Sequence, residues 1–188
     1  MSGRRALRNI RIGEYRHLMR LKCRENLDVL VEEHPYHERL NNAILEESLS
    51  FNFSRDSQGN VYGTKTQENN VCSRSIDIVR EWIINLIRAE HIGWKFKCTT
   101  SWLVKYQKGE YTLSHNHIPA DFSFVYFIKC PKGSSPLVLT TSGKKIKAQE
   151  GRVIILPGSM YHHISKNRSD DRMVYVGNVV HVEANDAL

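Results

Sequence analysis

The amino-acid sequence predicts a mainly β fold in which α-helices precede a barrel of short strands. Two observations carry this prediction. The hydrophobic pattern changes near residue 93, from helical spacing before it to alternating, β-branched segments after it. The chain has 188 residues, 40% of them hydrophobic and 25% charged, which is typical of one folded domain. We therefore expect a single domain over 1–188, made of a basic arm (1–24), supporting helices with a loop (25–93) and a β core (94–182).

Two helices are expected before residue 93. The segment 34–51 repeats apolar residues at helical spacing, and the segment 73–93 carries a longer apolar stripe that Ser73 or Ser75 could cap and Gly93 would end. We expect Trp82 and Trp94 to be core residues. The polar, Gly- and Asn-rich stretch 52–70 between the helices reads as a long loop or irregular hairpin, and as a possible lid over the barrel mouth.

The second half of the chain is a series of short β-prone segments separated by Pro and Gly turns. Helices followed by consecutive strands indicate an all-β barrel or sandwich with helices packed outside. The length and the frequency of turns favour a jelly-roll barrel of the cupin type, a double-stranded β-helix. The expected strands lie in 94–109, 121–131, 136–143, 144–151, 152–158 and 172–182.

The positive charge of the chain is concentrated in its first 24 residues. The formal net charge is +7, and residues 1–24 alone hold eight Lys or Arg against one acid, Glu14. We interpret this arm as a solvated leader packed on the domain edge, although a transit peptide or a contact with an anionic surface or a partner has the same composition. Nucleic acid is not an expected partner, because the arm is poor in aromatic residues that stack on bases.

The chain lacks the features of a membrane or secreted protein. No apolar run approaches the ~20 residues of a membrane helix, and the first residues lack the apolar core of a secretory signal. The four cysteines are scattered without a CxxC pair, so we interpret them as thiols of a reducing compartment and expect a cytoplasmic protein.

Histidines and one carboxylate mark a candidate metal site in the β half. His115 and His117 lie two residues apart before a β-prone run, so on extended chain both rings face one side. Asp121 follows four residues later. A later segment turns at Pro157-Gly158 and delivers His162 and His163, of which only one can point inward from a strand.

The sequence allows two hypotheses for the residues that bind the metal. His115, His117 and His162 could form a three-histidine site, or Asp121 could supply a carboxylate to complete the two-histidine, one-carboxylate set of non-haem Fe(II) enzymes. Arg172 opens a strand ten residues after His162, and we expect a hairpin to bring the two onto neighbouring strands. A guanidinium in that cavity suits a bidentate grip on a carboxylate. Iron, three protein ligands and this arginine together indicate a 2-oxoglutarate-dependent oxygenase.

The segment 102–178 resembles the Fe(II)/2-oxoglutarate oxygenases related to prolyl 4-hydroxylases, in particular the small phage and marine-bacterial type. The residues that carry the resemblance are Trp102, Gly109-Glu110, His115, His117, Ser123 to Phe127, Pro131, Gly151, Leu156-Pro157, His162, Arg172 and Asn178. The resemblance implies that His162 is a metal ligand and that Arg172 anchors the distal carboxylate of 2-oxoglutarate. Tyr106, Tyr126 and Asn178 are further candidates to hydrogen-bond this cosubstrate.

One departure from the family pattern leaves alternatives open. Where the superfamily has HxD or HxE, this chain has His117, and the run Gly109, His115, His117, Asp121 also resembles the first motif of cupins. We therefore carry three functions forward: an Fe(II)/2-oxoglutarate oxygenase hydroxylating an unknown substrate such as a peptidyl residue, a cupin-type three-histidine metalloenzyme without 2-oxoglutarate, and a non-catalytic jelly-roll binding module.

Overall fold

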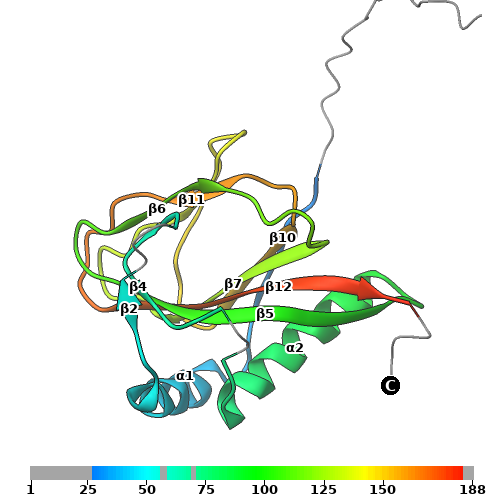
Figure 1. The fold of residues 1–188 in the computed structure, drawn as a ribbon, viewed down its shortest axis with the longest axis horizontal. Coiled ribbons are helices and arrows are strands. Elements are labelled where there is room, and N and C mark those ends of the chain that lie inside the picture. Colours follow the sequence, from blue (N-terminus) through cyan, green and yellow to red (C-terminus); the bar gives the residue numbers. More distant parts are fainter. Residues whose placement is uncertain (1–26, 56–58, 69–70, 184–188) are drawn as a thin grey trace, which may run out of the picture.

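Two antiparallel β-sheets face each other, and two helices cover the outer face of the larger one (Figure 1). The structure is a computed structural model that describes residues 27–55, 59–68 and 71–183. This arrangement confirms the expected mainly β jelly-roll with supporting helices. The basic arm (1–24), with Cys23, lies outside the described residues.

The larger sheet has seven strands in the order β1-β10-β7-β12-β5-β4-β2. Long pairings between β12 and β5 and between β12 and β7 form its centre. Its strands are β1 Leu30–Glu33, β10 Arg152–Pro157, β7 Phe122–Lys129, β12 Arg172–Val182, β5 Lys95–Tyr106, β4 Thr64–Lys65 and β2 Ser54–Arg55.

The smaller sheet has five strands in the order β3-β6-β11-β8-β9. These are β3 Val61–Tyr62, β6 Tyr111–His115, β11 His162–Ile164, β8 Leu137–Leu139 and β9 Lys145–Ile146. One hydrophobic core lies between the sheets and a second between the larger sheet and the helices. Strand β7 serves both cores: Val125 and Phe127 point between the sheets, while Phe124 and Tyr126 point toward the helices.

The two helices are α1 (His37–Glu47), which is followed by a 3₁₀ turn (Ser48–Ser50), and α2 (Arg74–Glu90). Ser73 caps α2, because its hydroxyl accepts a hydrogen bond from the backbone N–H of Ile76. Glu47 at the end of α1 accepts hydrogen bonds from the hydroxyls of Ser73 and Ser75 and so ties the two helices together. Trp82 packs against this core as expected, but Trp94 is 57% exposed, so its assignment to the core was wrong.

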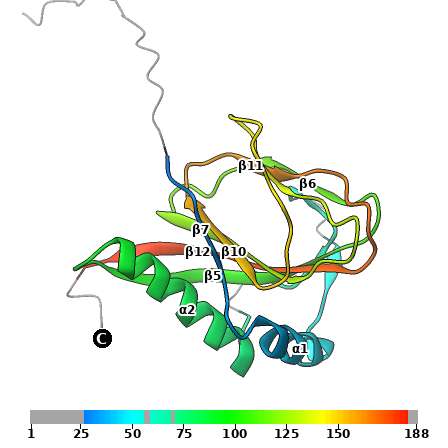
Figure 2. The ribbon, with the colours of Figure 1, turned by 180° about the vertical axis from the view of Figure 1, so that it is seen from behind.

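The first half of the chain holds more strands than its sequence suggests. Strand β1 lies along β10 at one edge of the larger sheet (Figure 2). The stretch 52–70 contributes β2, β3 and β4, of which β3 pairs with β6 in one sheet and β4 pairs with β5 in the other. This stretch therefore joins the two sheets at one side of the barrel.

Two further findings concern the described part of the chain. No helix in it combines the length and the hydropathy needed to cross a membrane. Its three cysteines, Cys72, Cys98 and Cys130, form no disulfide bond with one another.

Candidate active site

Three histidines meet on the inner face of the smaller sheet. His115 ends β6 and pairs directly with His162, the first residue of β11, while His117 follows two residues after β6. One ligating atom from each ring lies within 4.8 Å of the others. The ring centroids are 4.6 Å apart for His115 and His162, and 4.9 and 5.2 Å from His117 to these two. The cluster has the dimensions of a three-ligand metal site.

All three rings converge for two reasons: the register of β6 shifts, and backbone hydrogen bonds hold the loop that follows it. The pairing of β6 with β11 shifts between Thr112 and His115, so both of these side chains line the cavity. Beyond β6, the backbone N–H of His117 donates to the carbonyl of Gly158 (2.7 Å), and the N–H of Gly158 donates to the carbonyl of Asp121 (2.8 Å). The turn after β10 thereby holds the loop that carries His117.

Two of the rings have a defined tautomer. Nδ1 of His115 lies 2.8 Å from the carbonyl oxygen of Leu113, and Nδ1 of His162 lies 3.0 Å from that of Met160. A carbonyl only accepts hydrogen bonds, so each Nδ1 carries the proton and each Nε2 keeps its lone pair. Hydrogen bonds from the ring nitrogen that does not bind the metal orient metal-binding histidines.

The surroundings keep the three imidazoles neutral. Burial lowers the pKa of His117 to about 3, helped by the neighbouring His162 and His115. Burial also lowers the pKa of His162 to about 4, helped by His115, and lowers the pKa of His115 itself. Neutral imidazole is the form that binds a metal. The cluster is therefore ready to accept an ion at neutral pH without first losing protons.

Arg172 lies in the same cavity and forms no ion pair with any described residue. It is the first residue of β12, opposite Tyr106 of β5, and its side chain is fully buried. Its three guanidinium nitrogens have no hydrogen-bond partner among the described residues. The group sits over the rings of Tyr106 and Phe127, at 5.1 and 5.5 Å from their centroids. A buried, unpaired guanidinium is costly, so this position calls for an anionic ligand.

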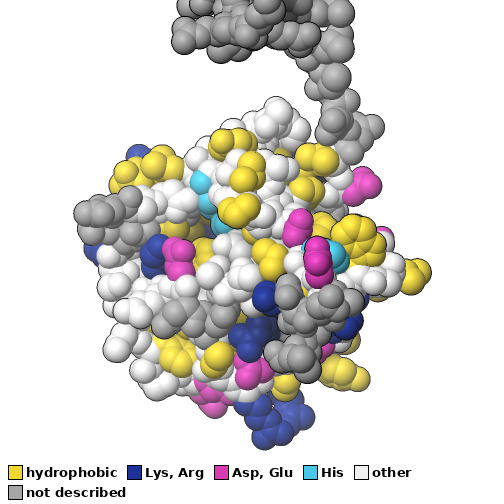
Figure 3. Space-filling view, turned by 45° about the vertical axis from the view of Figure 1, so that its right-hand side comes forward, with side chains coloured by type: hydrophobic (Ala, Val, Ile, Leu, Met, Phe, Trp, Pro, Cys, Tyr) yellow, Lys and Arg dark blue, Asp and Glu magenta, His cyan; other side chains and the backbone are white. Residues whose placement is uncertain are grey.

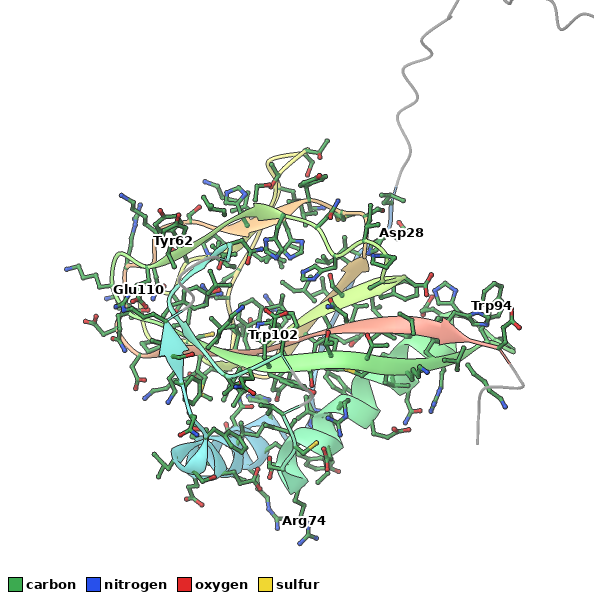
Figure 4. All side chains as sticks on the ribbon, in the orientation of Figure 1. Asp28, Tyr62, Arg74, Trp94, Trp102 and Glu110 are labelled. Atoms are coloured by element: carbon green, nitrogen blue, oxygen red, sulfur yellow. The ribbon has the colours of Figure 1, made fainter. Side chains whose placement is uncertain are left out.

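The cavity that contains these groups has a volume of about 250 Å³. Trp102 points into it from β5 (Figure 4), and its indole N–H is buried without a partner in the described structure. On the face in Figure 3, histidine side chains reach the surface beside hydrophobic ones. The residues that line the cavity include Tyr106, Thr112, Leu137, Val174, Val176 and Asn178. Apolar and polar residues contribute about equally to the lining, and the polar groups converge on one cavity, as in small-molecule sites.

Several expected site residues fall where the sequence placed them. His115, His117, His162, Arg172, Tyr106 and Asn178 all line the cavity. The hydroxyl of Tyr106 is 2.6 Å from that of Thr112, and the amide of Asn178 donates to Thr100. Of the two adjacent histidines, His162 joins the cluster, whereas Nδ1 of His163 is 3.0 Å from the hydroxyl of Thr140.

Three expectations need correction. The structure does not bring Asp121 to the cluster, because its carboxylate accepts a hydrogen bond from the backbone N–H of His181 (2.7 Å) on β12. Tyr126 faces the helices and donates to the side chain of Asn41, so it cannot reach the cavity. His162 and Arg172 lie not on neighbouring strands but on opposite sheets, and so face each other across the barrel.

The sequence predicted the stretch 52–70 as a loop or irregular hairpin over the barrel mouth and did not predict how its strands line the cavity. Asn60, Val61 and Glu68 from this stretch line the cavity, so it forms part of the cavity wall. Its strands are two residues long and carry no periodic pattern. The alternation of polar Asn60, apolar Val61 and polar Tyr62 was the one available sign of strand β3.

Comparisons with known proteins agree with this architecture. No protein-family model and no curated protein sequence matches the chain. Among solved structures, the viral collagen prolyl hydroxylase of Paramecium bursaria Chlorella virus-1, in complex with 2-oxoglutarate, is similar with a TM-score of 0.66 and 12% identity, over 82% of this chain and 96% of that one. A prolyl-4-hydroxylase of Pseudomonas putida has a TM-score of 0.65 and 12% identity, over 84% and 94% of the two chains.

A third structure extends the comparison beyond prolyl hydroxylases. HygX of Streptomyces hygroscopicus, with nickel and 2-oxoglutarate bound, has a TM-score of 0.65 and 9% identity, over 82% of this chain and 83% of that one. Identities this low establish a shared fold and leave the chemistry to the residues of each site. The chain therefore has the jelly-roll fold of the 2-oxoglutarate/Fe(II) oxygenases, with a three-histidine group in its barrel that could bind Fe(II).

Proposed function

We propose that this protein is an Fe(II)- and 2-oxoglutarate-dependent oxygenase that hydroxylates a C–H bond of a substrate still to be identified. The observation that carries the proposal is the buried, unpaired Arg172 in the same cavity as three neutral histidines. The first group needs an anion and the second suits a cation. A small dicarboxylate that reaches from the metal to the guanidinium would meet both needs.

Each residue has a distinct task in this proposal. His115, His117 and His162 would hold Fe(II) through their Nε2 atoms, and Arg172 would grip the far carboxylate of 2-oxoglutarate with two N–H groups. Bound iron and cosubstrate together supply the oxidising chemistry. The apolar walls and the rings of Tyr106 and Phe127 exclude water from the guanidinium, which strengthens its attraction to the carboxylate.

The three-histidine set gives this site a charge balance of its own. Three neutral ligands leave the full 2+ charge of the ion in place, whereas a carboxylate ligand would reduce it to 1+. With Arg172 added, and with the Glu68 carboxylate of the cavity wall paired with Lys65, the cavity presents a net positive charge and favours a dianionic cosubstrate. This argues that the absence of Asp121 from the cluster is compatible with 2-oxoglutarate chemistry.

The alternative is a cupin-type three-histidine metalloenzyme that works without 2-oxoglutarate. The ligand set favours this alternative, since it is the set that the cupin motif resembles. Arg172 separates the two functions, because a guanidinium lining the metal cavity has a purpose only if an anion binds beside the metal. Peptidyl residues are a reasonable substrate class, since two of the similar structures are prolyl hydroxylases.

An anaerobic titration of the metal-free protein with Fe(II) and then 2-oxoglutarate tests the proposal. We expect a visible metal-to-ligand charge-transfer band only when both are present, and its loss in Arg172→Met. Arg168→Met, which changes an exposed arginine just before β12, is the matched control and should keep the band. Iron binding without the band would favour the cupin-type enzyme, and absence of iron binding would refute both enzymatic functions.

A further inference from the structure

We infer that Asn178 is a positioning residue for the metal site: its side-chain oxygen accepts the Nδ1–H of His117 and thereby turns Nε2 of that ring toward the ion. This inference rests on the proposed metal site and deepens it. It also differs from the role that the family resemblance suggests for Asn178, which is a hydrogen bond to the cosubstrate.

The first step is the contrast among the three rings. His115 and His162 are each oriented by a backbone carbonyl two residues earlier in the chain, at Leu113 and Met160. The structure gives His117 no such backbone partner among the described residues. A metal-binding ring without an anchor would rotate, so a third anchor must come from another element.

Asn178 provides that element. It lies on β12 two residues beyond Val176, which pairs with Trp102, and the ring centroids of Trp102 and His117 are 6.4 Å apart. Asn178 and His117 line the same cavity, and in support the side chain of Asn178 acts to raise the pKa of His117, against the lowering by burial. An acceptor next to an imidazole has this effect, because it favours the ring form that carries more protons. Because the amide nitrogen is already bonded to Thr100, the amide oxygen is the group left to accept a hydrogen bond from the ring.

The orientation of the amide is fixed from its other end. Its nitrogen donates to the hydroxyl of Thr100 at 2.9 Å, on the neighbouring strand β5. Its oxygen is buried and has no hydrogen-bond partner in the described part of the chain. A buried carbonyl oxygen without a partner destabilises the folded protein. A bond from Nδ1–H of His117 would remove this cost and give His117 the same tautomer as the other two ligands.

An amide in this position differs from a carboxylate in a useful way. A carboxylate would also accept the imidazole proton, but it would add a negative charge to a cavity that must attract a dicarboxylate. The geometry thus predicts opposite effects for Asn178→Asp: metal binding is kept or strengthened, while 2-oxoglutarate binding is weakened.

The test measures Zn²⁺ affinity of the full chain by competition with a chromophoric chelator. We expect Asn178→Ala to weaken Zn²⁺ binding by about 10- to 100-fold, the usual effect of losing such a partner. Asn42→Ala, which removes an exposed amide on α1 away from the cavity lining, is the matched control and should change the affinity by less than about twofold. In ¹⁵N imidazole NMR of the zinc-loaded protein, the Nδ1–H of His117 should be protected from exchange in the wild type and exposed in Asn178→Ala.

Further variants keep the inference separate from the proposed function. Asn178→Asp retains the acceptor at the same size, and it should bind Zn²⁺ at least as tightly as the wild type. Thr100→Val releases the amide and should give a smaller loss than Asn178→Ala. If the wild type binds Zn²⁺ but Asn178→Ala binds it equally well and instead loses 2-oxoglutarate affinity, Asn178 contacts the cosubstrate and our inference is wrong. If the wild type itself binds no Zn²⁺, the metal site fails, and the inference fails with it.

Discussion

At the scale of single residues, the balance between stability and function is clearest at Arg172. The folded chain buries this guanidinium completely and provides no carboxylate for it within the described residues. Burial lowers the pKa of Arg172, which shows that its charged form is disfavoured there. The rings of Tyr106 and Phe127 offset part of this cost to folding, and an anionic ligand would offset the rest.

This argument predicts the stability of Arg172→Met. Without ligands, the variant should be more stable than the wild type by about 1–4 kcal/mol, the range seen when buried charges are replaced by apolar groups. For a chain of this size each kcal/mol raises the melting temperature by about 2–4 °C. Addition of 2-oxoglutarate should stabilise the wild type and not the variant. Scanning calorimetry with and without the dicarboxylate gives the comparison, and a variant that melts below the wild type would contradict it.

The choice between two adjacent histidines is a second question at this scale. His162 is buried in the cluster, whereas His163 contacts Thr140 outside it. We expect His162→Ala to lower Fe(II) affinity by about 100-fold or more, beyond the 10- to 100-fold that an outer-shell partner costs. His163→Ala serves as the neighbouring control and should bind within about threefold of the wild type. Equal losses in the two variants, measured by anaerobic equilibrium dialysis, would show that the assignment is incorrect.

At the scale of elements, the turn after β10 positions the loop that carries His117. The backbone of Gly158 bonds both to His117 and to Asp121, and a Cβ atom at Gly158 would lie 1.9 Å from the carbonyl oxygen of Ala120. A contact of that length is impossible, so any side chain at this position must displace the loop. The glycine is required by the close approach of two backbone segments.

Gly158→Ala should therefore damage stability and the site together. We expect a loss of about 1–3 kcal/mol, as for other overpacked positions, and weaker Zn²⁺ binding because His117 moves with the loop. Ser159→Ala, at the exposed next position of the same turn, should change neither quantity appreciably. Chemical unfolding and a zinc titration on the same samples measure both effects. Unchanged metal affinity in a destabilised Gly158→Ala would mean that the turn supports the fold alone.

The element scale also shows what the sequence could predict. Helix α2 and strands β5, β7 and β12 have long periodic patterns, and the structure confirms each of them. Strands β2, β3 and β4 are too short to have a period, and their pairing depends on β5 and β6, which are distant in sequence. Alternation could not decide which face of β7 is inward, because both faces are buried, and Tyr126 was therefore assigned to the wrong side.

Within the site, residue spacing predicted the rings better than the carboxylate. His115 and His117 are two residues apart, so almost any extended chain places both on one face. Asp121 is separated from them by the turn at 118–120, whose course depends on contacts with Gly158 and β12. A carboxylate four residues beyond a strand end can point in either direction, and here it bonds to the backbone of β12.

At the scale of the whole molecule, the two hydrophobic cores have separate roles. The core between the helices and the larger sheet holds the scaffold, whereas the core between the sheets surrounds the site. Ile83 on α2 is fully buried in the first core and is absent from the cavity lining. This separation allows stability and ligand binding to be changed independently.

Ile83→Ala tests the separation. We expect a loss of about 2–5 kcal/mol in the free energy of unfolding, because the cavity left by a large core residue cannot collapse fully. Metal and 2-oxoglutarate affinities, measured well below the melting temperature, should stay within about twofold of the wild type. A parallel loss of affinity would show that the helices act on the site through the larger sheet.

The acid sensitivity of the metal-free protein follows from the cluster as a whole. The folded-state pKa is about 3 for His117 and about 4 for His162, and it is also lowered for His115, mainly by burial. In the unfolded chain a histidine titrates near pH 6.5. Between that pH and about pH 4 the unfolded chain therefore binds protons that the folded chain does not. The free energy of unfolding must fall as the pH is lowered through this window, by at most about 1.4 kcal/mol per pH unit for each histidine.

His162→Gln removes one of these groups, so its stability should fall less steeply between pH 6.5 and 4 than that of the wild type. Urea unfolding at several pH values measures the two slopes, and parallel slopes would mean that the cluster takes up protons as readily in the folded protein as in the unfolded chain.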